Sequence, residues 1–390
     1  MALIDPGVPA EYAEHVTGDF RRAFGRSAVA VGHAPGRVNL IGEHTDYNAG
    51  RCRPVALPHA TYVAGALRTD GRMQVISRQA PNRWTGHVDR LGPGEADDWA
   101  AYVAGVLWAL REDGLDLRGV ELAIDSTVPL AAGLSSSAAV ECAVAAAVCG
   151  LLGADLSVER RHRLVEACIR AETEVAGAPT GGMDQTVALL ASPGAALLID
   201  FDTRTTRDVP LPLSAAGLAL LVTDTRVSHN LTDGGYGQRR DDCETAARRL
   251  GVPSLRHADL AEVESLADLR LRKRARHVVT EIGRVPEVVA AVESGDWAAL
   301  GPVFGASHTS MRDDFGISCD ELDVAVGTAV EAGALAARMT GGGFGGSSVA
   351  LVPDARFDAV VRAIDVAFAA AGYRQPAHLR VEPSGAAGLV

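Results

Sequence analysis

Lysine is almost missing from this chain. Lys273 is the only lysine among the 37 lysine and arginine residues. No glycine-rich segment contains Gly-Lys-Ser/Thr, so a Walker-type phosphate loop is excluded. Lys273 itself lies in the dense basic run of residues 270–276, which disfavours a Schiff-base mechanism. If the chain binds a nucleotide triphosphate, it does so without a loop lysine.

Other common signals are also sparse. The six cysteines form no Cys-x-x-Cys pair and are expected to be buried free thiols rather than metal ligands or disulfides. The net charge of −12 disfavours nucleic-acid binding, and the basic run 270–276 is interpreted as the solvated face of a helix. The longest apolar stretch, 138–152, contains Glu141 and is shorter than the ~20 residues of a membrane span. The first residues lack a basic region followed by an apolar run. We therefore expect a cytoplasmic monomer or weak oligomer without membrane or nucleic-acid partners.

The length of 390 residues suits two domains. Strands and helices alternate without a strict βαβ rhythm, which predicts an α+β fold. Pro210 and Pro212 interrupt the pattern, so the boundary is placed near residues 202–212, giving domains 1–205 and 206–390. Periodicity predicts helices over 10–24, 99–110, 138–152, 157–175, 236–250, parts of 268–334 and 356–370. An Ala/Arg-rich helix is also expected just before Gly341. Strands are predicted over 28–33, 61–66, 73–77, 120–126, 195–200, 217–223, 347–352 and 378–381.

The segment Pro129–Ala139 combines a glycine with three consecutive serines and opens one of these helices. Backbone N–H groups at a helix N-terminus, together with the helix dipole, suit a phosphate group. The serine hydroxyls add oxygen atoms for phosphate or a divalent ion. The alternative is a serine N-cap on an ordinary helix.

A second polar cluster follows Gly42. Glu43, His44 and Asp46 lie within four residues and each can bond a hydroxyl group. Such a cluster suits a polyhydroxylated ligand such as a sugar. A metal site and a solvated loop remain open, although the helical spacing of common metal sites is missing.

Two further glycine-rich segments carry weaker signals. Asp184 follows two glycines and could approach a substrate hydroxyl closely, or it could simply cap a helix. Gly341, Gly343 and Gly346 have the spacing of a dinucleotide fingerprint, but that fingerprint follows a strand and opens a helix. Here we expect a helix before and a strand after. The segment is therefore interpreted as a turn close to a ligand or to another loop.

Together these segments resemble the galactokinases of the GHMP kinase superfamily. The matching residues are 36–48 (the galactokinase signature), 129–139 (the phosphate loop), 183–185 (Met-Asp-Gln) and 340–346 (the C-terminal glycine motif). They span essentially the whole chain, and other superfamily members lack the Glu-His-Thr-Asp signature. The resemblance implies two α+β domains with the active site in the interdomain cleft. It also implies ATP-dependent phosphorylation of α-D-galactose at its 1-hydroxyl, the first step of the Leloir route.

The resemblance also implies roles for single residues. Asp184 would face the anomeric hydroxyl as general base, with Arg37 beside it keeping the carboxylate ionised and offsetting charge in the transition state. The sugar would contact Glu43, His44, Thr45, Asp46, Gly181 and Tyr236. The nucleotide would contact Ala131, Ala132, Gly133, Leu134, Ser135, Ser136 and Ser137, with Ser77 as a minor position. Mg²⁺ would be held by Ser137 and Glu172.

Some questions stay open at this level. A sister kinase acting on N-acetylgalactosamine needs room beside the 2-hydroxyl, which the sequence does not measure. A non-catalytic sensor that binds sugar and ATP is disfavoured because the serine loop (residues 129–139) has its full length. The chain also departs from the resemblance: Arg51 and Arg53 stand where an apolar strand is usual, so one or both are expected at a surface edge. Ser347 stands where many relatives carry cysteine.

Overall fold

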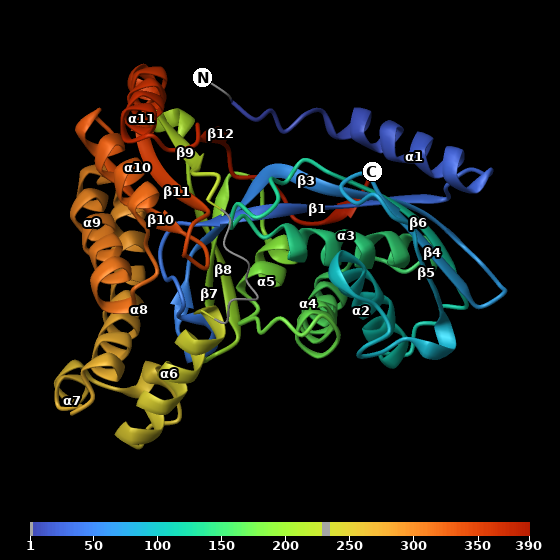
Figure 1. Cartoon of the computed structure of the whole chain (residues 1–390), viewed down its shortest axis with the longest axis horizontal. Coiled ribbons are helices and arrows are strands. Elements are labelled where there is room, and N and C mark those ends of the chain that lie inside the picture. Colours follow the sequence, from blue (N-terminus) through green and yellow to red (C-terminus); the bar gives the residue numbers. More distant parts are fainter. Residues whose placement is uncertain (1–2, 228–234) are drawn as a thin grey trace.

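The computed structural model describes residues 3–227 and 235–390, and its architecture is α+β, as predicted (Figure 1). The main helices are α1 (Pro9–Phe24), α2 (Asp98–Glu112), α3 (Ser136–Leu151), α4 (Val158–Arg170), α5 (Met183–Leu190), α6 (Gly235–Leu250), α7 (Leu260–Glu264), α8 (Leu269–Ser294), α9 (Leu300–Ser310), α10 (Asp320–Glu331) and α11 (Phe357–Ala371). The strands are β1 (Ala30–Asn39), β2 (Arg51–Cys52), β3 (Pro54–Leu67), β4 (Arg72–Ser77), β5 (Trp84–His87), β6 (Val120–Ser126), β7 (Ala195–Asp200), β8 (Thr205–Pro210), β9 (Leu218–Asp224), β10 (Ala336–Thr340), β11 (Ser347–Pro353), β12 (Ala377–Val381) and β13 (Gly388–Leu389).

These strands form three sheets, in the orders β13-β1-β3-β6-β4-β5, β10-β11-β9-β12 and β2-β7-β8. Their pairs are antiparallel except for β4 with β6. Helix α1 packs over β3 and β6 on one face of the first sheet, and α3 packs under β1 and β3 on the other (Figure 1). Helices α8 to α11 gather beside the second sheet (Figure 1). No described helix is both long and apolar enough to cross a membrane.

Helix α3 lies unusually close to the first sheet because small residues line their contact. A Cβ atom on Gly32 of β1 would lie 2.4 Å from the backbone nitrogen of Ala147. Ala143, Ala146 and Ala147 are fully buried there. The tight contact fixes the start of α3, and with it the serine loop, relative to β1.

Strand pairing near both chain termini links the first and second halves of the chain. Strand β13 pairs with β1, and Leu3 forms an isolated bridge with His378 of β12. The predicted boundary at residues 202–212 overlaps the turn and second strand of the β7–β8 hairpin, whose strands pair from Ala195 with Pro210 to Asp200 with Thr205. The division into residues 1–205 and 206–390 stays a prediction.

Most predicted elements are present, with one clear error. The helix expected before Gly341 is strand β10, which pairs with β11 along its whole length. Helix α10 ends earlier, at Glu331, and Gly333 (φ 108°) turns the chain in a conformation that favours glycine. The helix predicted over 157–175 does start at the Ser157 cap but ends as a π-helical turn over Ala171–Val175. Such turns often occur at functional sites.

The two arginines after Gly50 differ in environment. Arg51 is partly exposed and pairs with Asp200 (2.5 Å). Arg53 is fully buried, and its guanidinium has no hydrogen-bond partner among the described residues. Burial lowers the pKa of Arg53 to about 10. The expectation that one or both arginines lie at a surface edge is met by Arg51, whereas Arg53 lies in the interior.

Replacing Arg53 by methionine is expected to stabilise the protein by about 1–3 kcal/mol, because an unpaired buried charge is costly and methionine fills similar space. The measurement is the free energy of unfolding from denaturant titration. The matched control is Arg51→Met, which removes a solvent-accessible ion pair and should give no gain. A lower stability of Arg53→Met would show that the guanidinium contributes favourably.

Candidate active site

The serine loop presents a free helix N-terminus. Ala131 (φ 58°) and Ser135 (φ 59°) adopt left-handed backbone conformations, and α3 begins at Ser136. Ser135 occupies the N-cap position, but its side chain makes no capping hydrogen bond. Its hydroxyl donates instead to Asp184. The ordinary serine N-cap is therefore not what this segment forms, and the first amides of α3 have no side-chain cap.

The C-terminal glycine motif lies against this loop. A Cβ atom on Gly341 would lie 2.7 Å from the carbonyl oxygen of Gly133, and one on Gly346 would lie 3.1 Å from that of Ala132. The Ser347 hydroxyl donates to the Ala132 carbonyl (2.7 Å). The interpretation of residues 341–346 as a turn close to another loop is confirmed. Gly341 and Gly346 have no room for a side chain at this contact.

Arg37 and Asp184 form a bidentate ion pair. Arg37 lies on β1 just after a register shift, and its Nε and Nη2 donate to the two oxygens of Asp184 at 2.8 and 3.0 Å. Its Nη1 also donates to the carbonyl oxygen of Gly133. Asp184 lies in the first turn of α5, where the helix dipole favours a carboxylate. Burial alone would lower the pKa of Arg37, but Asp184 and then Glu43 reverse this and raise it.

A second group of oxygen atoms lies beside this pair. Glu172, in the π-helical turn, is 8% exposed and accepts a hydrogen bond from the Gln185 amide, with the Ser137 and Thr180 hydroxyls next to its carboxylate. The same Gln185 amide donates to Glu141 (3.0 Å), which is fully buried. Burial and the neighbouring Asp184 raise the pKa of Glu172 to about 7. A cation bound here would favour the ionised form of Glu172 and so counter this rise in pKa.

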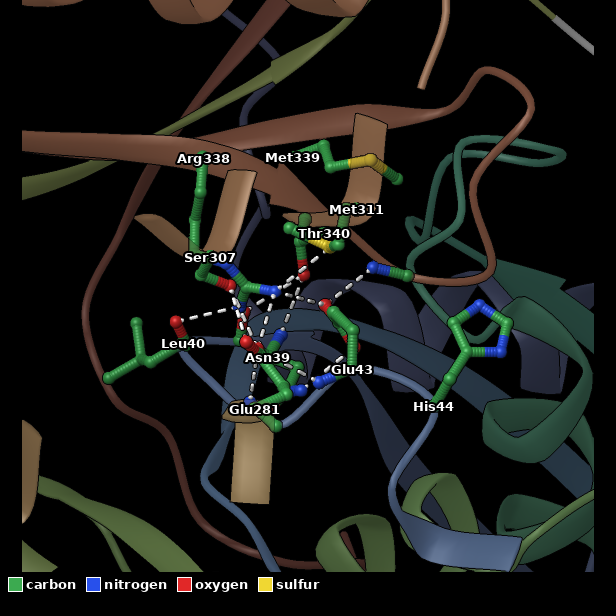
Figure 2. Close-up of polar contacts among 12 residues, drawn as sticks. Asn39, Leu40, Glu43, His44, Glu281, Ser307, Met311, Arg338, Met339 and Thr340 are labelled. Carbon is green, nitrogen blue, oxygen red and sulfur yellow. Dashed lines mark hydrogen bonds and ion pairs between the residues drawn. The ribbon is translucent and has the colours of Figure 1, made fainter. Parts of the chain in front are cut away.

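The loop after β1 holds the predicted sugar-contacting residues. Glu43 is 1% exposed, and its carboxylate accepts hydrogen bonds from Asn39 and from the Gly341 amide, both at 2.8 Å (Figure 2). His44 donates from Nε2 to the Gly342 carbonyl (3.2 Å) and accepts at Nδ1 from Tyr47 (2.8 Å). Burial, followed by His277, lowers the pKa of His44 to about 3, so the ring is neutral.

The remaining predicted residues fall into two groups. Asp46 lies under Gly181, where an added Cβ would be 2.1 Å from the carboxylate, and Tyr236 packs 5.1 Å from the His44 ring. The hydroxyls of Thr45 and Ser77 make other contacts. The Thr45 hydroxyl is buried and donates to backbone carbonyls of its own loop, and that of Ser77 donates to Gln79. Asp233 and Gly234, next to Tyr236 in sequence, lie outside the described residues.

Several polar residues of the site have no role predicted from the sequence. Asn39, Glu281 and Arg338 surround Glu43, and Gln185 joins Glu172 to Glu141. Asn39 and Gln185 belong to segments quoted for the resemblance. Glu281 lies in α8, far from any motif, and its signal is a charged residue on the apolar face of a helix.

Family models and solved structures place the chain in a class of kinases. Residues 101–192 match the model "GHMP kinases N terminal domain" and residues 288–370 match "GHMP kinases C terminal". The fold resembles the Methanococcus jannaschii mevalonate kinase with a TM-score of 0.68 at 15% identity, covering 92% of this chain and 100% of the other. Fold and loop arrangement thus define a GHMP kinase.

Within that class the family is also clear. Residues 18–67 match the "Galactokinase galactose-binding signature". A galactokinase of Streptomyces coelicolor is 48% identical over 374 residues, covering 94% of this chain and 96% of the relative. One from Canis lupus familiaris is 41% identical over 364 residues, covering 90% and 91%. The Lactococcus lactis galactokinase complexed with galactose has a TM-score of 0.90 at 30% identity, covering 96% and 98%. The chain belongs to the galactokinases.

Proposed function

We propose that Asp184 and Arg37 carry the reaction in which this chain, as a galactokinase, phosphorylates galactose with ATP in the Leloir route. The phosphoryl group is transferred to the 1-hydroxyl of α-D-galactose. The observation that carries the proposal is the convergence of Arg37 and Ser135 on the Asp184 carboxylate, beside the uncapped start of α3.

Asp184 accepts the proton of the sugar hydroxyl, or orients that hydroxyl, as the oxygen attacks the γ-phosphorus. The Arg37 guanidinium holds the carboxylate in place and adds a positive charge next to the transferring group. Phosphoryl transfer depends mainly on such positioning and charge stabilisation. The loop amides at 131–137 bind the phosphate oxygens in place of the missing lysine.

The sugar lies against the loop of Glu43, His44 and Asp46, with Tyr236 at its edge. Asp46 is more accessible than Glu43 and His44, whose polar atoms already have protein partners. Gly181 lets the Asp46 carboxylate lie directly against the backbone, because any Cβ there would be 2.1 Å from it. Asp46 is therefore assigned as the principal acceptor for sugar hydroxyls.

Mg²⁺ fits the group around Glu172. A carboxylate and the Ser137 hydroxyl are hard oxygen ligands, and Mg²⁺ usually completes its shell with water and substrate phosphates. Among the described residues no cluster of three or more His, Cys, Asp or Glu side chains could hold a metal by itself. When bound with ATP, the ion neutralises charge on the phosphate oxygens.

A coupled assay of ADP release with galactose and MgATP tests the function directly. NMR of the product should show the phosphate at position 1. A panel that includes N-acetylgalactosamine measures the room beside the 2-hydroxyl. A protein that binds both ligands without forming ADP would instead be a sensor.

Galactose binding is expected to weaken as the pH falls below about 6. Burial, followed by the nearby Asp184 charge, raises the pKa of Asp46 from 3.8 to about 6. The ionised form is the better hydroxyl acceptor, so affinity is complete above this pKa and is lost as pH falls through it. Calorimetric titration with galactose alone, across this pH range, measures the effect. The Asp46→Asn variant should bind weakly at every pH and lack this transition. A transition near pH 4 would contradict the assignment.

A further inference from the structure

Glu281 of α8 accepts hydrogen bonds from the backbone of the loop after β1 (the sugar loop, residues 42–46). Its Oε1 atom lies 3.0 Å from the Gly42 nitrogen and 3.3 Å from the Glu43 nitrogen. The Ser307 hydroxyl of α9 lies 2.8 Å from both carboxylate oxygens. Figure 2 shows the Glu281 side chain pointing toward the loop from its helix. Glu281 is fully buried, so these contacts exclude water.

Two arginines keep Glu281 charged. Arg284 lies 3.0 Å from Oε2, and Arg338 of β10 lies 3.4 Å from Oε1. Burial would raise the pKa of Glu281, but Arg338 first and then His277 lower it to about 2. Arg338 also lies 3.7 Å from Glu43. One buried cation therefore connects the helix carboxylate with a carboxylate of the sugar loop (Figure 2).

His277, one helical turn before Glu281, holds the next peptide group of the loop. Its Nε2 donates to the Glu43 carbonyl (3.2 Å), and its Nδ1 accepts from Ser310 (3.0 Å). Residues four positions apart share one face of a helix. The peptide groups on both sides of Glu43 are thus held by a single face of α8.

The loop needs this support because its backbone is strained. Gly42 has φ 93°, and His44 has φ 60°, a conformation that non-glycine residues rarely adopt. A Cβ atom on Gly42 would lie 2.4 Å from the Arg51 carbonyl oxygen. Such conformations persist only where the surroundings impose them. The amides that donate to Glu281 belong to Gly42 and Glu43, the two residues directly before the strained His44.

We propose that Glu281 is a positioning residue for galactose: its carboxylate fixes the Gly42–His44 backbone in the conformation that binds the sugar. Glu281 does not touch the sugar itself. The inference rests on the proposed function, because it assumes that this loop contacts galactose. Affinity for the sugar is then set partly from the C-terminal half of the chain, at a residue outside the galactose-binding signature of residues 18–67.

The test compares Glu281→Gln with Glu287→Gln, an exposed glutamate on the same helix. The first change removes the charge at nearly constant shape. It should raise the galactose dissociation constant and KM by about tenfold or more, because small displacements of binding groups have effects of this size. KM for ATP should stay unchanged. Hydrogen exchange in a peptide covering residues 40–48 should also quicken, since its amides lose a charged acceptor. Glu287→Gln should change none of these.

Ser307→Ala provides a milder variant in case Glu281→Gln does not fold. It removes one donor to the carboxylate and should raise the galactose dissociation constant by about threefold. Unchanged galactose affinity in a folded Glu281→Gln, or in Ser307→Ala when Glu281→Gln does not fold, would overturn the inference. Equal increases in KM for galactose and ATP would also overturn it, because a purely structural role predicts a general loss. If the unmodified protein did not phosphorylate galactose, the proposed function itself would fail, which is a separate result.

Discussion

Asp184→Ala is expected to lower kcat by about a thousandfold or more, with ATP affinity nearly unchanged. A positioned base contributes roughly 10²–10⁴-fold. The variant also loses the group that Arg37 and Ser135 orient toward the sugar. The side chain is 22% exposed, so its removal leaves no large buried cavity and the fold should persist. Steady-state kinetics with galactose and MgATP, together with ATP titration, measure both effects.

Asp184→Asn separates two roles of the carboxylate. Asparagine can still accept a hydrogen bond, but it does not take a proton at neutral pH. If Asp184 mainly orients the hydroxyl, Asn should retain much more activity than Ala. If it removes the proton, the two variants should be similarly inactive. Asp208→Asn, at an exposed position of β8, is the matched control. Near-normal turnover of Asp184→Ala would remove this residue from the mechanism.

Much of the fold follows from local patterns in the sequence. The strand predicted over 195–200 is β7, and the helix predicted over 236–250 is α6 with one more residue at its start. Each has a simple signal in the sequence. The segment of β7 is a short, mostly apolar run, and the segment of α6 has no glycine or proline after Gly237. The pairing of Arg37 with Asp184 has no such signal. The two residues are 147 positions apart, and only the family resemblance brought them together.

The errors arise where tertiary contacts outweigh local preference. Residues 336–340 contain alanine, arginine and methionine, which favour helices, yet all five residues are buried in a strand. For the two arginines after Gly50, the sequence does not tell the partly exposed Arg51 from the fully buried Arg53. No motif marks Glu281, so the sequence predicts no role for it. Its position between Val278 and Val285, on the buried face of α8, was the available signal.

Arg37→Ala is the second large effect, with an expected loss in kcat of about 10²–10³-fold. Arg37 joins three parts of the site: β1, the Asp184 carboxylate on α5 and the Gly133 carbonyl of the serine loop. A lysine could not hold these acceptors at once, because its single ammonium group lacks the planar fork of arginine. Arg37→Lys should therefore remain strongly impaired. The matched control is Arg51→Ala, which removes another Arg–Asp pair at a partly exposed position. Wild-type kcat in Arg37→Ala would exclude a catalytic role.

The double variant Arg37→Ala/Asp184→Ala shows whether the pair acts as a unit. If Arg37 works chiefly by holding Asp184 in place, its loss costs little once Asp184 is gone, and the double variant should match Asp184→Ala. If Arg37 also stabilises charge on the transferring phosphoryl group, the double variant should be slower still. Groups in direct contact are commonly far from additive. The bidentate geometry favours the first outcome for most of the effect, because two of the three Arg37 hydrogen bonds end on the Asp184 carboxylate.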